Sequence, residues 1–374
     1  MITRELTRIQ KGERPIEPNM ISENKSYPDY YLVPRVYNHN VSRLFRNITK
    51  TSTDHKLFIP IPQEAYLMEN KSFFEIKPSI HPVNHSFSFL ITGESVCQET
   101  PFLLVVIPSV IDHREMREAI RRTWIKAAET NSWPRANVTV RLKHIFLFGY
   151  NKNSKLQDFR RLLRESHEHR DVVMVDFEDS YRNLTIKILS GLRWMTSFCP
   201  RAEFLLKVDE DTFINAPLMT ELLLRVRQEE RTGKYVLGLR HAYRQPVVAR
   251  HGKWAVSKEE YPLDYYPHYL YGHTYAISRL GVGELLDKSK YARIIAPEDA
   301  YITGILPKIS GIPRLGAPSF AVCCRLIYDC EVVWNRRVAL TAVVNTKTLN
   351  QLWANVLGDV CDKDVAFIDG RLIK

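Results

Sequence analysis

The stretch Phe204-Leu205-Leu206-Lys207-Val208-Asp209-Glu210-Asp211-Thr212-Phe213-Ile214-Asn215 decides the fold of this chain. An apolar run that breaks off into Asp-x-Asp is typical of a buried strand that delivers two carboxylates to the carboxyl edge of a sheet. Open α/β sheets bind their ligands at that edge. A hard divalent cation held by one or two carboxylates keeps positions open for substrate phosphates. The stretch therefore indicates a metal and a diphosphate, whereas a solvated acidic turn is the simpler interpretation of an Asp-x-Asp taken alone.

The chain before this stretch alternates between strand and helix patterns. Apolar runs predict strands and amphipathic patterns predict the helices between them, in the order strand 102–109, helix 112–124, strand 144–149, helix 156–169 and strand 171–177. Residues 179–187 then lead into a helix through Trp194 to Cys199. This alternation up to residue 215 predicts a mostly parallel, Rossmann-like sheet. No Gly-x-Gly-x-x-Gly follows the first strand, which disfavours a dinucleotide-binding oxidoreductase.

Composition sets the outer limits on class. The 374 residues, 45% of them hydrophobic, suffice for one large core or two smaller ones. A formal charge of +11 suits an anionic partner. Basic residues are spread along the chain without the aromatic spacing of a nucleic-acid module, so we expect no nucleic-acid partner.

Cysteines and sequons bear on the compartment. The six cysteines form no Cys-x-x-Cys pair, which argues against structural zinc, and they permit disulfides whose pairing the sequence leaves open; they are Cys97, Cys199, Cys323, Cys324, Cys330 and Cys361. Seven Asn-x-Ser/Thr sequons support passage through the secretory lumen, at Asn24, Asn40, Asn47, Asn70, Asn84, Asn137 and Asn183. Residues 1–20 lack the apolar core of a signal peptide, and no run approaches twenty apolar residues. Either an anchor precedes this sequence or the sequons are idle in a cytosolic protein.

The organisation expected from these patterns has three parts. Residues 1–95 are punctuated by prolines and predict a weakly structured stem or linker, with a small β-rich cap as the alternative. Residues 96–331 form the main domain, and residues 332–374 close the same domain with a strand and a helix.

Three further segments carry candidate chemistry. Arg117 and Arg121 lie one helical turn apart beside the end of the first strand, where they can meet a nucleotide diphosphate or remain solvated. The tyrosine-rich segment 261–273 is either packing or a platform for a sugar ring. Asp299, in Pro297-Glu298-Asp299, is either a partner of a helix dipole or a general base.

Five ordered blocks resemble the β1,3-galactosyltransferase and β1,3-N-acetylglucosaminyltransferase family over about residues 97–330. They are Arg117-x-x-x-Arg121-x-Thr123-Trp124, Phe146-Leu147-Phe148-Gly149, Asp176-Phe177-x-Asp179-x-Tyr181-x-Asn183-Leu184-Thr185-x-Lys187, Lys207-Val208-Asp209-Glu210-Asp211 and Glu298-Asp299-Ala300-Tyr301-x-x-Gly304. The resemblance implies a GT-A fold, a Rossmann-like mixed sheet flanked by helices. It also implies an inverting, Mn²⁺-dependent hexosyltransferase that uses a UDP-sugar donor and a glycan acceptor on glycoprotein or glycolipid, forming a β1,3 linkage. Residence would be the Golgi lumen, as a type II membrane protein.

Site residues follow from the same resemblance by position. Asp211 is the implied metal ligand, and Asp209 beside it faces the metal and the donor. The implied donor-nucleotide contacts are Arg117, Arg121, Asp179 and Lys187. Asp299 is the implied base, because an inverting transfer needs a carboxylate that takes the acceptor proton while the metal neutralises the leaving diphosphate.

The sequence also departs from the family pattern. Glu210 replaces the middle Asp of Asp-Asp-Asp, and the family's Cys-x-Gly-x-Gly-Tyr is here Leu270-Tyr271-Gly272-His273-Thr274-Tyr275. The bulk at Tyr271 and His273 leaves the donor sugar and acceptor open, and His273 is either loop packing or an additional metal ligand. A degenerate transferase that binds glycans or partners without catalysis is the alternative interpretation. Phe213 excludes both an EF-hand loop and an Asp-x-Asp-x-Thr phosphatase.

Overall fold

The structure is a computed structural model. It describes residues 58–61, 87–134, 136, 138–150, 154–241, 245–317, 319–321, 338–340, 343, 345–358, 366–368 and 371–373. All of these belong to one compact unit, Ser42–Lys374. Four of the cysteines, six of the sequons and most of the predicted stem lie outside the described residues.

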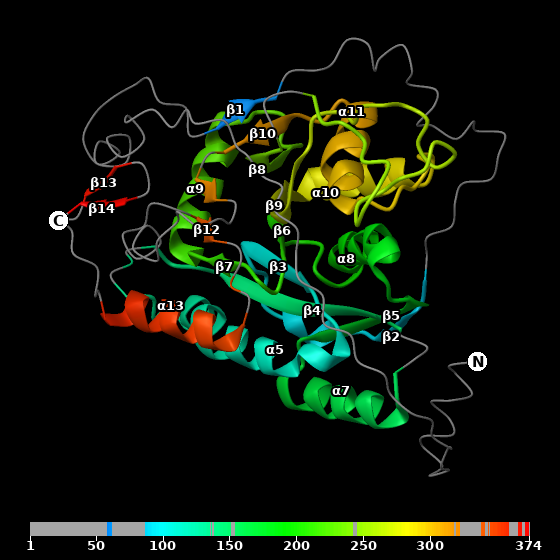
Figure 1. Cartoon of the computed structure of the whole chain (residues 1–374). Coiled ribbons are helices and arrows are strands. Elements are labelled where there is room, and N and C mark those ends of the chain that lie inside the picture. Colours follow the sequence, from blue (N-terminus) through cyan, green and yellow to red (C-terminus); the bar gives the residue numbers. More distant parts are fainter. Residues whose placement is uncertain are drawn as a thin grey trace. The chain divides into compact units, whose positions relative to one another are not determined.

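A nine-stranded mixed sheet organises this unit (Figure 1). Its order is β1 (Ile59–Pro60), β10 (Arg314–Gly316), β8 (Val236–Arg240), β9 (Leu270–Ser278), β6 (Phe204–Val208), β3 (Leu103–Pro108), β4 (Leu142–Tyr150), β5 (Val172–Glu178) and β2 (Phe89–Ile91). The four central strands β6, β3, β4 and β5 are parallel, and β9 and β2 flank them antiparallel. The predicted α/β fold with a mixed sheet is confirmed. Two short pieces of the predicted stem are the edge strands β1 and β2.

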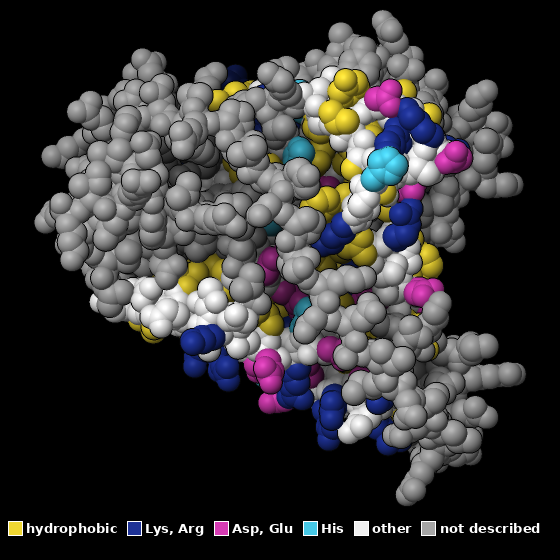
Figure 2. Space-filling model, viewed as in Figure 1, with side chains coloured by type: hydrophobic (Ala, Val, Ile, Leu, Met, Phe, Trp, Pro, Cys, Tyr) yellow, Lys and Arg dark blue, Asp and Glu magenta, His cyan; other side chains and the backbone are white. Residues whose placement is uncertain are grey.

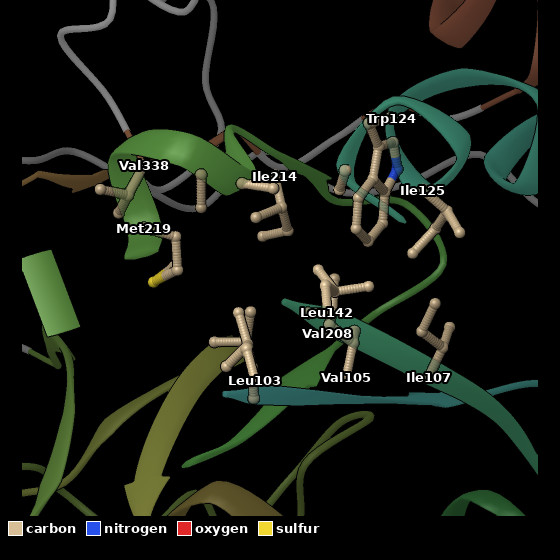
Figure 3. Close-up of a cluster of buried hydrophobic side chains, with 14 of the residues drawn as sticks. Leu103, Val105, Ile107, Trp124, Ile125, Leu142, Val208, Ile214, Met219 and Val338 are labelled. Atoms are coloured by element: carbon tan, nitrogen blue, oxygen red, sulfur yellow. The ribbon is translucent and has the colours of Figure 1, made fainter. Parts of the chain in front are cut away.

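The central strand β3 is buried on both faces because its side chains alternate between two cores. Leu103, Val105 and Ile107 belong to one core, and Leu104 and Val106 belong to the other. Figure 3 shows Leu103, Val105 and Ile107 directed toward the same apolar cluster as Trp124 and Met219. A continuous apolar run in the sequence is what such a doubly covered strand requires.

Helices cover both faces. The first core is closed by α5 (Arg114–Ile120), α6 (Lys126–Glu129), α7 (Leu156–His169), α9 (Ala216–Glu229) and α13 (Thr346–Gly358). The second core is closed by α8 (Leu184–Phe198), α10 (Arg279–Ser289) and α11 (Leu306–Ser310). Figure 1 shows α5, α7 and α13 together below the sheet and α8, α10 and α11 above it.

The helix predicted at 112–124 is present but interrupted. A 3₁₀ turn (Ile111–His113) precedes α5, and a π-helical turn (Arg121–Ile125) follows it. Within that turn Thr123 leaves helical geometry, with φ −102° and ψ −114°, and its hydroxyl donates to the Ala119 carbonyl over 2.7 Å. A threonine that bonds back to the preceding turn competes with the helical ladder, which accounts for the interruption.

The C-terminal part closes onto the Asp-x-Asp loop. β7 (Phe213–Ile214), which follows that loop, pairs with β12 (Ala339–Leu340), and β12 pairs with β11 (Phe320–Ala321). The Val343 N–H also donates to the Asp211 carbonyl over 2.8 Å. A separate hairpin joins β13 (Ala366–Ile368) to β14 (Arg371–Ile373).

A disulfide joins Cys97 to Cys199 and so ties the turn before β3 to the end of α8. The disulfide prediction is confirmed for this pair. Asn183, the one sequon asparagine that the structure describes, donates from its side chain to the Glu178 carbonyl. Among the described residues, no helix combines the length and apolar character needed to cross a bilayer.

Candidate active site

The site lies where neighbouring parallel strands send the chain in opposite directions. β3 continues toward β4 on one side, while β6 lies on its other side, and both strands end at the same sheet edge. Such a switch point leaves a crevice at the carboxyl ends of the strands. A cleft of about 1390 Å³ lies there, lined by the loops after β3 and β6, by α7 and by the start of α13. Figure 2 shows acidic side chains near the centre of this face, and acidic and basic side chains along the rim over α5 and α7.

Glu210 joins the two loops that meet at this edge. Its carboxylate accepts a hydrogen bond from the Ser109 hydroxyl after β3 and lies 2.6 Å from His113 Nδ1. The hydrogen bond to Glu210 raises the pKa of His113. Glu210 is therefore engaged in positioning the loops, and Asp209 and Asp211 remain as the carboxylates available to a ligand.

Asp209 and Asp211 fit a hard divalent cation. Asp211 is exposed, and the side chain of Asp209 is 38% exposed. Partial burial and the neighbouring charge of Asp209 raise the pKa of Asp211, and a bound cation would relieve this repulsion. In the described part of the chain, no three His, Cys, Asp or Glu side chains gather around a metal position. His273 packs edge-on against Tyr271, which supports the packing interpretation of this residue.

A buried lysine lies beneath this pair. Lys207, whose side chain is 1% exposed, places Nζ 2.6 Å from Asp209 Oδ1 and 3.7 Å from Glu298 Oε2, and it donates to the Gly272 carbonyl. Burial alone would lower the pKa of Lys207, but the charges of Asp209 and Glu298 raise it. One cation thus connects the Asp-x-Asp loop with the segment that carries Asp299. We call Lys207, Asp209, Glu298 and Asp299 the Lys207 cluster.

Asp299 lies on the far side of this cluster. Its Oδ1 accepts the Ala300 N–H over 2.9 Å at the start of a π-helical turn (Ala300–Ile305). Burial raises the pKa of Asp299 to about 6 and that of Glu298 to about 7. Glu298 also accepts the Tyr275 hydroxyl. A carboxylate with a pKa near neutrality suits a general base.

Gly272 makes room for Asp299. A Cβ at this position would lie 3.1 Å from Asp299 Oδ2, closer than ordinary packing allows. The one glycine that this segment keeps is therefore the one beside the carboxylate, and the bulk of Tyr271 and His273 flanks it without occupying the same space.

The predicted donor contacts Arg117 and Arg121 are buried, and Arg117 is among the residues that line the cleft. Arg117 is buried, and its guanidinium donates to both carboxylate oxygens of Glu165 over 2.7 and 2.8 Å and to Ser109 Oγ over 3.0 Å. Arg121 donates to both oxygens of Asp171 over 2.7 and 2.8 Å and to Glu165 over 2.8 Å. Arg117 therefore positions the loop after β3, whereas Arg121 ties the end of α5 to Glu165 and Asp171. A donor contact by either arginine stays a prediction.

His144 completes this second group of charges. Its Nε2 lies 2.9 Å from Asp171 Oδ2 and its Nδ1 lies 2.9 Å from Glu129 Oε1. Burial alone would lower the pKa of His144, but these two carboxylates raise it to about 9. We call Arg117, Arg121, His144, Glu165 and Asp171 the α5 cluster.

Lys187 and Asp179 form a buried pair next to the same loop. Lys187 Nζ lies 2.7 Å from Asp179 Oδ2 and donates to the Ser109 carbonyl over 2.7 Å. Asp179 also accepts the Gly149 N–H over 3.0 Å. The structure therefore brings both residues to the loop after β3, and their contact with a nucleotide stays a prediction.

The sequence profile described as Galactosyltransferase matches residues 115–317, a little over half of the chain. The chain belongs to the galactosyltransferase family. Membership makes the protein a hexosyltransferase, and the matched range contains both the Asp209 to Asp211 loop and Asp299.

Individual relatives agree with the family. Beta-1,3-galactosyltransferase 5 of Homo sapiens is 34% identical over 226 residues, covering 60% of this chain and 68% of the relative. Beta-1,3-galactosyltransferase 1 of Mus musculus is 30% identical over 316 residues, covering 83% and 90%. The apo structure of the bifunctional glycosyltransferase WbbM aligns at a TM-score of 0.28 and 17% identity over 57% of this chain and 38% of that one, a likeness too weak to bear on the fold.

Several residues of this galactosyltransferase-family site carried no role in the sequence-based prediction. Two of them lie within the motifs named in the sequence. Lys207 could have been noticed as a charged residue in an otherwise apolar strand, and Glu298 as a second acid beside Asp299. Ser109 had no signal beyond ending a strand. The segment 332–374, predicted only to close the domain with a strand and a helix, also contributes residues to the cleft lining; they are Asn345, Thr346 and Asn350.

The tyrosine-rich segment mostly packs. Tyr261, Tyr266 and Tyr269 are buried, and their rings contact one another at centroid distances of 4.9 Å (Tyr261 to Tyr266) and 6.1 Å (Tyr266 to Tyr269). These three rings belong to the second core of the galactosyltransferase domain, so they cannot offer a face to a sugar.

Proposed function

We propose that this hexosyltransferase moves galactose or an N-acetylhexosamine from a UDP-sugar to a glycan hydroxyl, with inversion and in β1,3 linkage. The observation that carries the proposal is the arrangement of two separate carboxylate sets around Lys207. Asp209 and Asp211 form one set, and Asp299 lies in the other. The relatives are named beta-1,3-galactosyltransferases, and this activity supports the linkage.

Asp299 is the proposed base. At neutral pH its carboxyl, with a pKa of about 6, is largely ionised and can accept the proton of the attacking acceptor hydroxyl. Lys207 and the Ala300 N–H hold the segment and the carboxylate in place, and Gly272 leaves the space that Asp299 occupies. Positioned base catalysis of this kind contributes roughly 10²–10⁴ in rate.

Asp209 and Asp211 are the proposed metal ligands, and Mn²⁺ is the proposed cation. When bound, such a cation neutralises charge that develops on the leaving diphosphate. The chain's own contribution is to hold the loop that carries both residues. Lys207 fixes Asp209 from below, and Glu210 ties the loop to Ser109 and His113.

The proposed setting is the Golgi lumen, as a type II membrane protein with its acceptors on glycoproteins or glycolipids. The Cys97–Cys199 disulfide supports an oxidising compartment. The seven sequons of the full sequence support the same compartment.

A donor scan tests the proposal. The purified chain with Mn²⁺ is assayed for hydrolysis and transfer with UDP-galactose, UDP-N-acetylglucosamine and UDP-N-acetylgalactosamine, and we expect one donor to dominate. Turnover of none of them by folded protein would contradict the proposal and favour a glycan-binding or partner-binding module.

Calorimetry tests the metal assignment separately. Asp211→Ala should abolish the Mn²⁺-dependent part of UDP binding, because it removes one of the two carboxylates that would hold the cation. The matched control is Asp287→Ala, which removes an exposed aspartate of α10. Unchanged Mn²⁺-dependent binding in Asp211→Ala would refute the assignment.

A further inference from the structure

Two exposed aromatic rings stand apart from the buried tyrosines. Tyr181 is 49% exposed and Trp254 is 51% exposed, although both are large apolar side chains. Lys253 lies between them, with Nζ 5.2 Å from the Tyr181 ring centroid and 5.7 Å from the Trp254 ring centroid. Figure 2 shows hydrophobic side chains next to basic ones over the loops that connect β8 and β9. Ring faces and a cation thus share one surface.

The loop that carries Trp254 is held firmly from within. The guanidinium of Arg250 donates to four backbone carbonyls, at 2.6 to 3.1 Å, from Val256, Ser257, Tyr261 and Leu263. Fixing several carbonyls with one planar group removes the freedom that an exposed loop otherwise has. Trp254 is therefore presented by an ordered loop, which lowers the entropy that a ligand would have to overcome.

The same loop is joined to the segment that carries Asp299. Glu260 accepts from Arg182 over 2.5 Å and from the Ala296 N–H over 2.8 Å, so it connects the residue after Tyr181 with the residues before Asp299. Thr185 adds a bond from its hydroxyl to the Ile295 carbonyl over 2.8 Å.

The pKa of Tyr181 agrees with its place near the segment that carries Asp299. Burial, and after it the negative charge of Asp299, raises the pKa of Tyr181 to about 12. The ring face of Tyr181 lies toward Lys253, whose Nζ is 5.2 Å from the ring centroid.

We propose that Tyr181, Lys253 and Trp254 form the acceptor subsite and that a hexose or N-acetylhexosamine ring of the acceptor glycan stacks on Trp254. A sugar ring has an apolar face of C–H groups, which suits an aromatic face, and its hydroxyl oxygens accept from an ammonium group. The bonds of Glu260 and Thr185 join this surface to the segment that leads to Asp299. The proposal rests on the transferase function proposed above and names the part of that site which selects the acceptor.

Saturation-transfer NMR tests sugar binding without requiring turnover. The probes are methyl β-galactoside, methyl N-acetyl-β-glucosaminide and N-acetyllactosamine. We expect at least one to receive saturation at its ring protons from the wild-type protein, with a dissociation constant that rises roughly tenfold in Trp254→Ala. Trp254→Phe keeps an aromatic face and should restore most of the affinity. Binding of none of the probes by the wild-type protein would overturn the proposal.

A matched control separates lost stacking from lost folding. Leu280→Ala removes a side chain of α10 that is as exposed as Trp254, and it should leave sugar affinity and melting temperature unchanged. Should Trp254→Ala melt like this control and bind the probe within twofold of wild type, the subsite assignment is wrong.

Kinetics then locate the effect on the acceptor side. With the preferred donor, Trp254→Ala should raise the acceptor KM by a factor similar to the loss of affinity, with a smaller change in kcat. Failure of the wild-type protein to turn over any UDP-sugar would count against the transferase function. The NMR result still decides whether Trp254 binds sugar, so the two failures are distinguishable.

Discussion

The α5 cluster and the Lys207 cluster are both groups of charge in the interior, yet they are balanced in opposite ways. In the α5 cluster three cations, Arg117, Arg121 and His144, face the buried carboxylates of Glu165 and Asp171. The more exposed Glu118 and Glu129 add an ion pair each, to Arg121 and to His144. In the Lys207 cluster one cation faces three carboxylates. The pKa values follow this balance. Those of Glu165 and Asp171 are lowered by their cationic partners in spite of burial, whereas those of Glu298 and Asp299 are raised.

The difference teaches how one domain uses buried carboxylates for two purposes. A carboxylate held by several donors stays ionised and fixes the elements around it, here α5, α7 and β4. When several buried carboxylates share one cation, their pKa values rise toward neutral pH, and such a carboxylate can gain and lose a proton during proton transfer. Position in the sheet separates the two, because only the Lys207 cluster reaches the edge after β6.

Asp299→Asn tests the reactive cluster most directly. It should lower kcat by roughly 10²–10⁴ while leaving UDP affinity unchanged, because an amide cannot accept the acceptor proton. Steady-state kinetics and calorimetry on the same preparation measure both. Transfer at the wild-type rate would show that the base lies elsewhere.

Arg117→Met tests the other cluster. It leaves Glu165 buried with fewer partners, and we expect the free energy of unfolding to fall by about 3–5 kcal/mol, measured by denaturant titration. The exposed substitution Arg225→Met on α9 is the control. A loss of UDP affinity with no loss of stability would instead support the donor contact implied by resemblance.

The pH dependence should separate the clusters by sign. Because Asp299 must be ionised to act, kcat/KM should fall about tenfold per unit as pH drops below about 6. For Glu298 and Asp299 the folded pKa lies above the unfolded value, so their contribution to stability is present at low pH and is lost as pH rises to about 7.

The carboxylates of the α5 cluster have the opposite sign. The folded pKa values of Glu165 and Asp171 lie below the unfolded values, so their stabilisation is present at neutral pH and is lost as pH falls below about 4. His144 has a raised pKa, so its stabilisation is lost as pH rises through about 9. The free energy of unfolding should be measured from pH 3 to 10 for the wild type and for Glu298→Gln. In the variant, the dependence of this free energy on pH should become weaker only below pH 7. An unchanged curve in that window would contradict the assignment of the shifts.

Gly272→Ala should have the smallest of these effects. The added methyl would lie 3.1 Å from Asp299 Oδ2, so the carboxylate must move by a few tenths of an ångström. We expect kcat to fall roughly fivefold at unchanged UDP affinity. Gly283→Ala on α10, where a Cβ meets nothing within 4 Å, is the control. Equal kcat in both variants would show that Asp299 has room to spare.

The sequence predicted the parts of this domain that depend on local pattern. The runs at 102–109 and 204–208 became central strands because a strand covered on both faces must be apolar throughout. The position of Asp209 and Asp211 at the sheet edge was predicted because they directly follow the apolar run that forms β6. The π-helical turn at Arg121 was not predicted, because it depends on how Thr123 bonds to its own helix.

Contacts between residues that are far apart in the chain could not be predicted from the sequence. Arg117 is 48 residues from Glu165, and nothing local distinguishes an arginine that faces a diphosphate from one that is already paired. The same holds for the tyrosines, because Tyr265 is exposed whereas Tyr261 and Tyr266 in the same short segment are buried. The role of such a side chain depends on which distant residues it contacts in the fold, and the spacing of residues in one sequence does not reveal those contacts.

The disulfide between Cys97 and Cys199 spans 102 residues and turns the first half of the domain into a covalent ring. The whole α5 cluster lies inside that ring, and the whole Lys207 cluster lies outside it. A protease cut anywhere between the two cysteines would leave both pieces attached until a reductant opens the bond. The half of the domain that holds the α5 cluster should therefore survive nicking as a two-chain protein, whereas a cut between Asp211 and Asp299 would break the covalent connection between these two residues.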